Sequence, residues 1–314
     1  MNKIFVLMSL IPMLLILFSC SGPAVTPSPV TVSNGTVERI ADFPSKHVGP
    51  RHVEIWLPEG YPGDEKYAVL YLHDGQMLFD ASTTWNKQEW GIDEVMGGLL
   101  KDGKIRKTIV VGIWNTGGRH AEYFPQKPFE RLPRAFADSL MQSAKRNDQT
   151  PLFSSSVQSD NYLKFIVSEL KPFIDRRYET KTDAANTVVA GSSMGGLISL
   201  YALCEYPDIF GGAACISTHW TGTFTAENNP IPDAFITYLG EKLPDPVSHK
   251  LYFDHGTETL DTLYRPFQIV VDSVATAGGF AGSHWQSLEF QGADHSEKSW
   301  RKRIHIPLMF LLGE

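Results

Sequence analysis

The residues best suited to chemistry form the pentapeptide Gly191-Ser192-Ser193-Met194-Gly195. It joins an apolar strand-like run to an apolar helical run, the setting in which Gly-x-Ser-x-Gly marks a sharp turn that exposes a serine hydroxyl. Glycines at 191 and 195 remove side chains that would clash there, so the turn can hold Ser193 at a strained backbone angle. The sequence therefore predicts that Ser193 is a nucleophile. The alternative is a plain Gly/Ser turn between a strand and a helix.

A serine hydroxyl is a weak nucleophile and needs a neighbouring base. Where such a turn is catalytic, the histidine comes last in the chain, on a loop after the final strand. His295 fits, because it follows the apolar run ending at Phe290 across a short loop and precedes a helical stretch. We therefore predict His295 as the base. Most other histidines are more simply surface or packing residues.

An oriented carboxylate is also required, normally just beyond the strand that precedes the histidine strand. After residues 250–256 the sequence offers Asp261 and Glu258, whereas Asp254 still lies within the strand and can brace the loop. Asp261 is preferred because it opens the next helical stretch, although it can serve there simply as an N-cap. Glu258 is the alternative acid.

Two backbone N–H groups are expected to form an oxyanion hole. One belongs to Met194, directly after the nucleophile. The other is expected from Gln76, because Gly75 permits a tight loop after the strand-like run 67–73. The alternative is that this Asp-Gly loop is only a β-turn.

Several polar and aromatic residues lie on or just after predicted strand ends, where they are candidates to contact a substrate. Each is explained equally well as core or rim packing. The candidates are His73, Asp74, Trp114, Asn115, His219 and Trp220. Arg119 and Glu122 are further candidates for a polar substrate.

The elements that must position these residues alternate between apolar strand-like runs and amphipathic helical stretches. This alternation predicts an α/β fold with a mostly parallel sheet and helices on both faces. Residues 117–159 have no clear pattern and are expected to form a long excursion that shapes a binding cleft. The predicted strands are 52–58, 67–73, 108–114, 186–192, 212–218, 250–256 and 285–290. The predicted helices are 92–101, 160–177, 194–206, 261–277 and 297–311.

The N-terminal residues form a separate segment, with a lysine, an apolar run over residues 4–18, and then Ser19 and Cys20. The run is too short for an ordinary transmembrane helix. It resembles the bacterial lipobox, which implies a signal peptide over residues 1–19 and acylation of Cys20. The protein would then be exported and lipid-anchored to a bacterial membrane. An ordinary secretory signal is the alternative.

Residues 20–36 are rich in Ser, Pro, Thr and Gly and predict a flexible tether, which leaves residues 37–314 as the folded domain. Cys204 and Cys215 lie in apolar contexts and are expected to be buried thiols.

Composition limits the kinds of partner. The chain has 314 residues, 42% hydrophobic, and a formal net charge of -7. A large core is therefore expected, whereas nucleic-acid binding is not, since the sequence contains no basic stripe. The histidines match no zinc spacing and no Gly-rich phosphate loop occurs, so we expect no metal or cofactor. A small molecule or a glycan is the expected partner.

Four segments together resemble one esterase family of α/β-hydrolases, which includes enterochelin, feruloyl and acetylxylan esterases, S-formylglutathione hydrolase and mycolyltransferases. The segments are YLHDGQMLFD, GIWNTGGRHAEYFP, AGSSMGG and GADHSEKSWRKRI. The likeness extends over residues 37–314 and implies an α/β-hydrolase fold. It further implies that Ser193 and His295 are nucleophile and base, with Gln76 and Met194 as oxyanion donors. Many relatives carry an acid three positions after the loop glycine, where this chain has Thr259, so the resemblance leaves the acid open and a Ser-His dyad remains conceivable.

The expected function is that of a serine carboxylic ester hydrolase working through an acyl-enzyme. Its expected substrate is an acetylated or hydroxycinnamoylated carbohydrate, or a related small ester. The alternatives are an acyltransferase of the same fold and a binding lipoprotein without catalysis.

Overall fold

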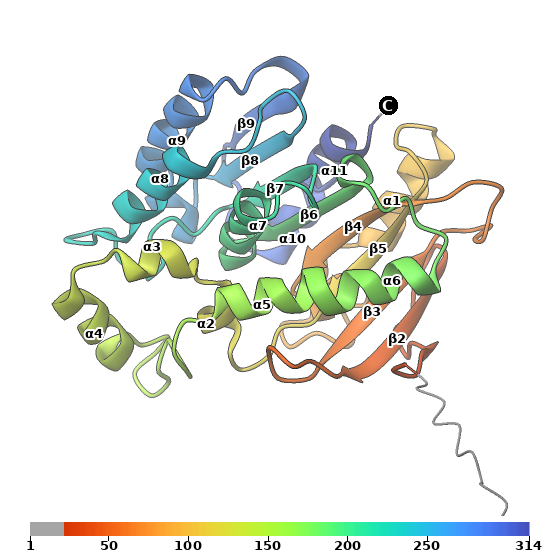
Figure 1. The fold of residues 1–314 in the computed structure, drawn as a ribbon, viewed down its shortest axis with the longest axis horizontal. Helices are drawn as coiled ribbons and strands as arrows, with labels where there is room; N and C mark the ends of the chain where they lie inside the picture. Colours follow the sequence, from red (N-terminus) through yellow and green to blue (C-terminus); the bar gives the residue numbers. More distant parts are fainter. Residues whose placement is uncertain (1–21, 314) are drawn as a thin grey trace, which may run out of the picture.

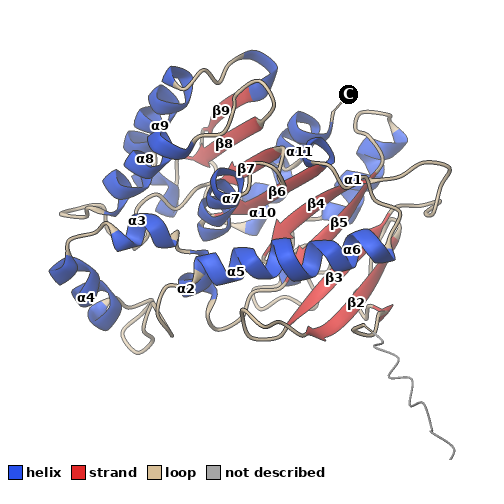
Figure 2. Ribbon diagram, viewed as in Figure 1, coloured by secondary structure: helices blue, strands red, loops and turns tan. Residues whose placement is uncertain are grey.

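A nine-stranded sheet runs through residues 22–313, the part of the chain that the computed structural model describes. Helices cover both faces of the sheet (Figures 1 and 2). The strands, in the order in which they pair, are β1 (Thr26–Pro27), β2 (Thr36–Phe43), β3 (Arg51–Leu57), β5 (Thr108–Ile113), β4 (Ala68–His73), β6 (Thr187–Ser192), β7 (Gly212–Ile216), β8 (Lys250–Gly256) and β9 (Trp285–Phe290).

The sheet is parallel from β5 to β9, and β1, β2 and β3 extend it in antiparallel pairing. Every residue of β4, β5, β6 and β7 is buried. Strands covered on both faces are continuously apolar, which is why these runs were readable in the sequence. The prediction of a mostly parallel sheet between two helical layers is confirmed.

The helices divide into two layers, each with its own apolar core. One layer contains α1 (Ile92–Lys101), α10 (Glu297–Arg303) and α11 (His305–Leu312). The other contains α2 (Arg119–Tyr123), α3 (Gln126–Glu130), α4 (Arg134–Ser143), α5 (Ser159–Phe165), α6 (Lys171–Arg177), α7 (Met194–Glu205), α8 (Ile231–Lys242) and α9 (Arg265–Ala277). A π-helical turn, Ile166–Leu170, joins α5 to α6, and the two form the long helix that crosses in front of the sheet in Figure 1.

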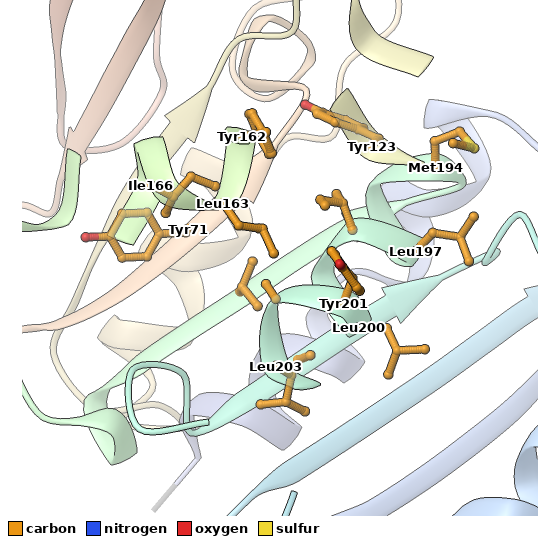
Figure 3. Close-up of a cluster of buried hydrophobic side chains, with 14 of the residues drawn as sticks. Tyr71, Tyr123, Tyr162, Leu163, Ile166, Met194, Leu197, Leu200, Tyr201 and Leu203 are labelled. Atoms are coloured by element: carbon orange, nitrogen blue, oxygen red, sulfur yellow. The ribbon is translucent and has the colours of Figure 1, made fainter. Parts of the chain in front are cut away.

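Helix α7 is apolar on all sides, and every residue from Met194 to Cys204 is buried. A helix of this composition must lie inside a protein. Figure 3 shows its side chains Leu197, Leu200 and Tyr201 in one cluster with residues of α5 and β4. The segment that follows Ser193 is therefore fixed by packing along its length.

The structure differs from the sequence prediction at two helices. The predicted helix 261–277 divides into a 3₁₀ segment, η4 (Thr259–Leu263), and α9, and Pro266 lies in the first turn of α9. Proline is tolerated in that turn because its missing N–H would have no partner there. The predicted helix 297–311 divides likewise into α10 and α11, with Pro307 in the first turn of α11.

Strands β1 and β2 and helices α2, α3, α4 and α8 were not predicted. Three of these helices lie within the predicted excursion 117–159, which is therefore partly helical. Their sequences are short or polar, so a helical period was not visible before the tertiary contacts were known.

The N-terminal segment lies along the domain over its described residues. The backbone N–H groups of Thr31 and Ser33 donate to the carboxylates of Asp80 and Asp93 at 2.9 and 2.6 Å. The indole of Trp56 donates to a backbone carbonyl of the same segment. These contacts differ from the free tether expected for residues 20–36.

The predicted signal peptide and Cys20 lie outside the described residues, so acylation and membrane attachment stay predictions. Within residues 22–313 no helix has the length and apolar character needed to cross a bilayer. Cys204 and Cys215 are free and buried, as their contexts predicted.

Candidate active site

The backbone at Ser193 makes the sharp turn that the sequence predicted. Ser193 lies between β6 and α7 with φ 57° and ψ −121°, a conformation that side-chain-bearing residues rarely adopt. Its N–H donates to the carbonyl of Ile216 at 2.8 Å, and its carbonyl accepts from the N–H of His219 at 3.2 Å. The strain is therefore held by bonds to β7 and to the loop after it.

The two turn glycines have different roles. A Cβ on Gly191 would lie 2.7 Å from the carbonyl carbon of Gly195, a distance that real Cβ atoms do not show. A Cβ on Gly195 would meet only ordinary contacts, the nearest 3.5 Å away on His73. The predicted clash therefore applies to a side chain at 191 and not to one at 195.

His295 lies on the loop between β9 and α10, and its Nδ1 is 2.5 Å from Oδ1 of Asp261. The backbone N–H of His295 donates to Oγ1 of Thr259 at 2.9 Å. Both the ring and the backbone of His295 are thus held by the η4 turn. With Nδ1 engaged, Nε2 is the ring nitrogen left for a substrate or a nucleophile.

The Asp261 carboxylate is completely buried, and both of its oxygens have partners. Its Oδ2 accepts from the hydroxyl of Ser217 and from the N–H of Gly256, each at 2.6 Å. Burial acts to raise the pKa of Asp261, but the contacts with His295, Ser217 and Gly256 outweigh it and hold the pKa below its usual value. A carboxylate that accepts several hydrogen bonds stays ionised in this way.

The structure brings Asp261, and not Glu258, to His295. Glu258 precedes η4 and is exposed, and among residues 22–313 no hydrogen bond or ion pair joins its side chain to His295. Spacing in the sequence left these two residues almost equivalent. The geometry of the turn separates them.

Each of the two expected oxyanion donors lies at the start of a helical turn that follows a strand. Met194 is the first residue of α7, and Gln76 lies in a single 3₁₀ turn, Gly75–Met77, after β4. N–H groups at the start of a helix have no acceptor within it. Gly75 is required, because a Cβ there would lie 2.5 Å from the carbonyl carbon of Gly112. Gln76 lines the same cavity as Ser193.

A cavity of about 990 Å³ contains Ser193 and His295 in its wall. The predicted excursion 117–159 supplies one side of it, including Arg119 and Leu152. Trp85, which the sequence did not single out, lines the cavity while 82% of its surface is exposed. The sequence feature that could have pointed to Trp85 is an aromatic residue in a mostly polar loop.

Two of the predicted substrate residues, Asp74 and Asn115, line this cavity. Asp74 accepts from the amide of Asn115 at 2.6 Å and forms a two-bonded ion pair with Arg119, both bonds 2.7 Å long. Burial acts to raise the pKa of Asp74, but Arg119 outweighs it and lowers the pKa. This pair fixes the wall of the cavity beside the Gln76 turn.

Four other predicted residues do not line the cavity, which corrects the expectation from strand-end position. Each uses its polar atom in a hydrogen bond within the protein, and all but the half-buried Trp114 are buried. His73 bonds Tyr162 at 2.8 Å, His219 bonds Tyr264 at 2.6 Å, Trp114 donates to Glu54 at 3.2 Å and Trp220 donates to Gln268 at 2.9 Å. Glu122, the further candidate, pairs with buried Arg51.

Tyr264, three residues after Asp261, was also missed. Its side chain is fully buried, its ring packs edge-on against His295 with centroids 5.8 Å apart, and its hydroxyl lies 2.6 Å from Nδ1 of His219. Tyr264 lies between η4 and α9, and no sequence pattern marks a tyrosine at such a junction. Among residues 22–313, no group of three or more His, Cys, Asp or Glu is arranged to hold a metal ion.

Comparison with known proteins places this arrangement in a family. Residues 46–307 match the family described as "Putative esterase". The chain belongs to this esterase family. It is 25% identical over 279 residues to an endo-1,4-beta-xylanase/feruloyl esterase of Xylanibacter ruminicola, covering 86% of this chain and 30% of that protein. It is 26% identical over 199 residues to the ferri-bacillibactin esterase BesA of Bacillus subtilis, covering 63% of this chain and 62% of that protein. The chain thus spans less than two thirds of the length of these relatives.

Two solved structures match the fold of this chain. A ferulic acid esterase of Anaeromyces mucronatus matches with a TM-score of 0.59 and 20% identity, over 89% of this chain and 90% of that one. An enterochelin esterase of Shigella flexneri matches with a TM-score of 0.62 and 17% identity, over 90% of this chain and 60% of that one. The predicted α/β-hydrolase fold is confirmed.

We predict that Asp261→Asn lowers kcat on a simple ester by roughly 10⁴-fold, because an amide cannot hold the His295 ring and stabilise its charged form as a carboxylate does. The matched control, Glu258→Gln, should keep wild-type kcat. Initial rates with 4-nitrophenyl acetate measure both. A large loss in Glu258→Gln with little loss in Asp261→Asn would reverse the assignment.

A second prediction concerns His73, whose burial lowers its pKa from 6.5 to about 3. Between those pH values the unfolded chain binds a proton that the folded chain does not, so the free energy of unfolding falls as the pH falls. His73→Gln should reduce the loss of unfolding free energy between pH 7.5 and pH 5 by about 2 kcal/mol. Urea denaturation at both pH values measures it, with exposed His305→Gln as the control. An unchanged loss in His73→Gln would contradict the burial of a neutral ring.

Proposed function

We propose that the protein is a serine carboxylic ester hydrolase with Ser193 as nucleophile, His295 as general base and Asp261 as the orienting acid. The observation that carries this proposal is the 2.5 Å contact between Asp261 and His295 at the wall of the cavity that also contains Ser193. Membership in an esterase family and the strained backbone at Ser193 support it. No step of the proposed mechanism requires a cofactor.

In the first half of the reaction, the Ser193 hydroxyl attacks the ester carbonyl while Nε2 of His295 takes its proton. Asp261 stabilises the resulting imidazolium through Nδ1. The bond to the leaving alcohol then breaks, and the imidazolium returns the proton to the alcohol oxygen. The acyl group remains on Oγ of Ser193.

In the second half, His295 removes a proton from water, and the hydroxide attacks the acyl carbonyl. The bond between the acyl carbon and Oγ breaks, and Ser193 regains its proton from His295. The N–H groups of Gln76 and Met194 stabilise the oxyanion in both halves. One such donor is typically worth about 2.7–4 kcal/mol of barrier.

We propose further that the substrate is an acylated carbohydrate or a related small ester. Trp85 supports this, because an indole that stays 82% exposed at a cavity wall offers a flat apolar face for a sugar ring or a phenolic acyl group. The names of the relatives, an endo-1,4-beta-xylanase/feruloyl esterase and a ferri-bacillibactin esterase, agree with an ester substrate, and the first name agrees with a feruloyl ester. A cavity of about 990 Å³ is large enough for more than an acetyl group.

The nucleophile is tested by Ser193→Ala. We expect it to lower turnover of 4-nitrophenyl acetate and methyl ferulate by several orders of magnitude and to abolish labelling by a fluorophosphonate, because no other hydroxyl replaces the attacking oxygen. Circular dichroism should be unchanged. Equal labelling of wild type and variant would remove Ser193 from the mechanism. Absence of labelling and turnover in the folded wild type would favour a binding protein.

Trp85 tests the substrate class. Trp85→Ala should raise KM for a feruloylated or acetylated xylo-oligosaccharide by about three- to tenfold, the contribution of one aromatic contact. The same variant should leave kcat/KM for 4-nitrophenyl acetate unchanged, and Trp85→Phe should restore most of the lost affinity. An equal effect on both substrates would mean that Trp85 supports the cavity rather than a sugar.

A further inference from the structure

The hydroxyl of Ser217 makes every hydrogen bond open to it, directly behind the candidate acid. Its oxygen donates to Oδ2 of Asp261 at 2.6 Å, and it accepts from Nε1 of Trp300 at 3.0 Å and from Nη2 of Arg303 at 2.9 Å. An indole N–H and a guanidinium only donate, whereas a hydroxyl has one proton and two lone pairs. Trp300 and Arg303 therefore occupy both lone pairs, and the one proton of Ser217 is directed at Asp261.

A buried ion pair fixes the guanidinium that bonds Ser217. Arg303 donates from Nε and Nη2 to Oδ1 of Asp254 at 3.2 and 3.0 Å, and both side chains are buried. The hydroxyl of Tyr252 donates to the other oxygen of Asp254 at 2.9 Å. Asp254 thus balances the buried charge of Arg303, which would be costly without a partner.

The backbone of Ser217 belongs to the segment that also holds the nucleophile. Ser217 has φ 43°, in the left-handed region that residues with side chains seldom adopt. On either side of it in the chain, the carbonyl of Ile216 accepts from the N–H of Ser193, and the N–H of His219 donates to the Ser193 carbonyl. The segment after β7 therefore holds Ser193 by its backbone and Asp261 by the side chain of Ser217.

We propose that Ser217 is a positioning residue, which holds the Asp261 carboxylate so that its Oδ1 faces His295. The proposal rests on the proposed serine mechanism. Oδ2 is held by the Ser217 hydroxyl and by the N–H of Gly256, each at 2.6 Å, while Oδ1 lies 2.5 Å from Nδ1 of His295. Two donors on one oxygen fix the rotation of the carboxylate, and removal of one of them frees it.

The Ser217 hydroxyl also separates Arg303 from Asp261. Both groups bond the same oxygen, so the hydroxyl stands between the guanidinium and the carboxylate. Without it, the guanidinium would compete with the imidazolium of His295 for the carboxylate, because both are charged donors. Since Asp261 stabilises the imidazolium in both half-reactions, loss of the hydroxyl should slow acylation and deacylation alike.

The experiment measures kcat and KM for 4-nitrophenyl acetate in Ser217→Ala and Ser217→Gly of the full chain. Both variants remove the hydroxyl and leave the pair of Arg303 and Asp254 intact. Glycine adopts φ 43° without strain, so Ser217→Gly should fold even if Ser217→Ala does not. We expect kcat to fall about tenfold to hundredfold, the range for a hydrogen bond to a charged group. KM should change by less than about twofold, because Ser217 is 0% exposed and does not bind the substrate.

A double-mutant cycle shows whether Ser217 acts through the acid. In the Asp261→Asn background, Ser217→Ala should lower kcat by less than about twofold, because no carboxylate is left to position. Thr187→Val is the matched control. It removes another fully buried hydroxyl, which donates to the carbonyl of Asp183 at 3.0 Å at the other end of β6 from Ser193, and it should keep wild-type kcat. Circular dichroism and urea denaturation establish that each variant is folded.

The outcomes separate this inference from the proposed function. If the wild type shows no turnover that depends on Ser193, the serine mechanism fails and the inference fails with it. If the wild type turns over but Ser217→Ala lowers kcat equally in both backgrounds, Ser217 contributes only packing and the inference is overturned. Wild-type kcat in folded Ser217→Gly would overturn it as well, since the carboxylate would then hold its orientation without the hydroxyl.

Discussion

The backbone conformation of Ser193 is the constraint on which the rest of the structure depends. A residue with a side chain at φ 57° and ψ −121° costs on the order of 1–3 kcal/mol and persists only where its surroundings impose it. Two hydrogen bonds, to Ile216 and from His219, impose it on one side. On the other side α7 is buried along its length, so the turn cannot relax by moving the helix. The apolar core around α7 therefore helps to hold Ser193 in the conformation that the candidate site requires.

The order of the strands explains why distant residues meet. Strands β6, β7, β8 and β9 are parallel neighbours, so their carboxyl ends share one edge of the sheet, the edge at which α/β folds place their sites. The turn after β6 carries Ser193, the turn after β8 carries Asp261 and the loop after β9 carries His295. Because each residue follows its own strand, the distances between them are set by the spacing of the strands. The loops only direct the side chains.

The sequence predicted what depends on burial and on chain order. Strands buried on both faces read as continuous apolar runs, and the serine turn and late histidine have fixed places relative to them. Strand β2, in the antiparallel part of the sheet, was missed because its buried residues form neither a continuous apolar run nor a two-residue alternation. His219 and Trp220 were misplaced for another reason. A position at a strand end says which edge of the sheet a residue reaches, but not whether its side chain points into the cavity or into a packed layer.

The acid was ambiguous in the sequence because Glu258 and Asp261 are only three residues apart. Only the backbone of η4 decides which of the two carboxylates faces His295.

The departure of this chain from its family at position 259 has a physical explanation in the same turn. Where many relatives are expected to carry the acid, this chain has Thr259 at φ 54°, and its hydroxyl accepts from the backbone N–H of His295 at 2.9 Å. The carboxylate is supplied two residues later by Asp261, which binds the ring. One turn therefore holds His295 at two points, with a neutral group on the backbone and a charged group on the imidazole. Since Asp261 is also bonded by Ser217 and Gly256, it has little freedom to leave the ring. Asp261 thus reaches the imidazole from this turn, and a Ser-His dyad is not needed to account for the sequence.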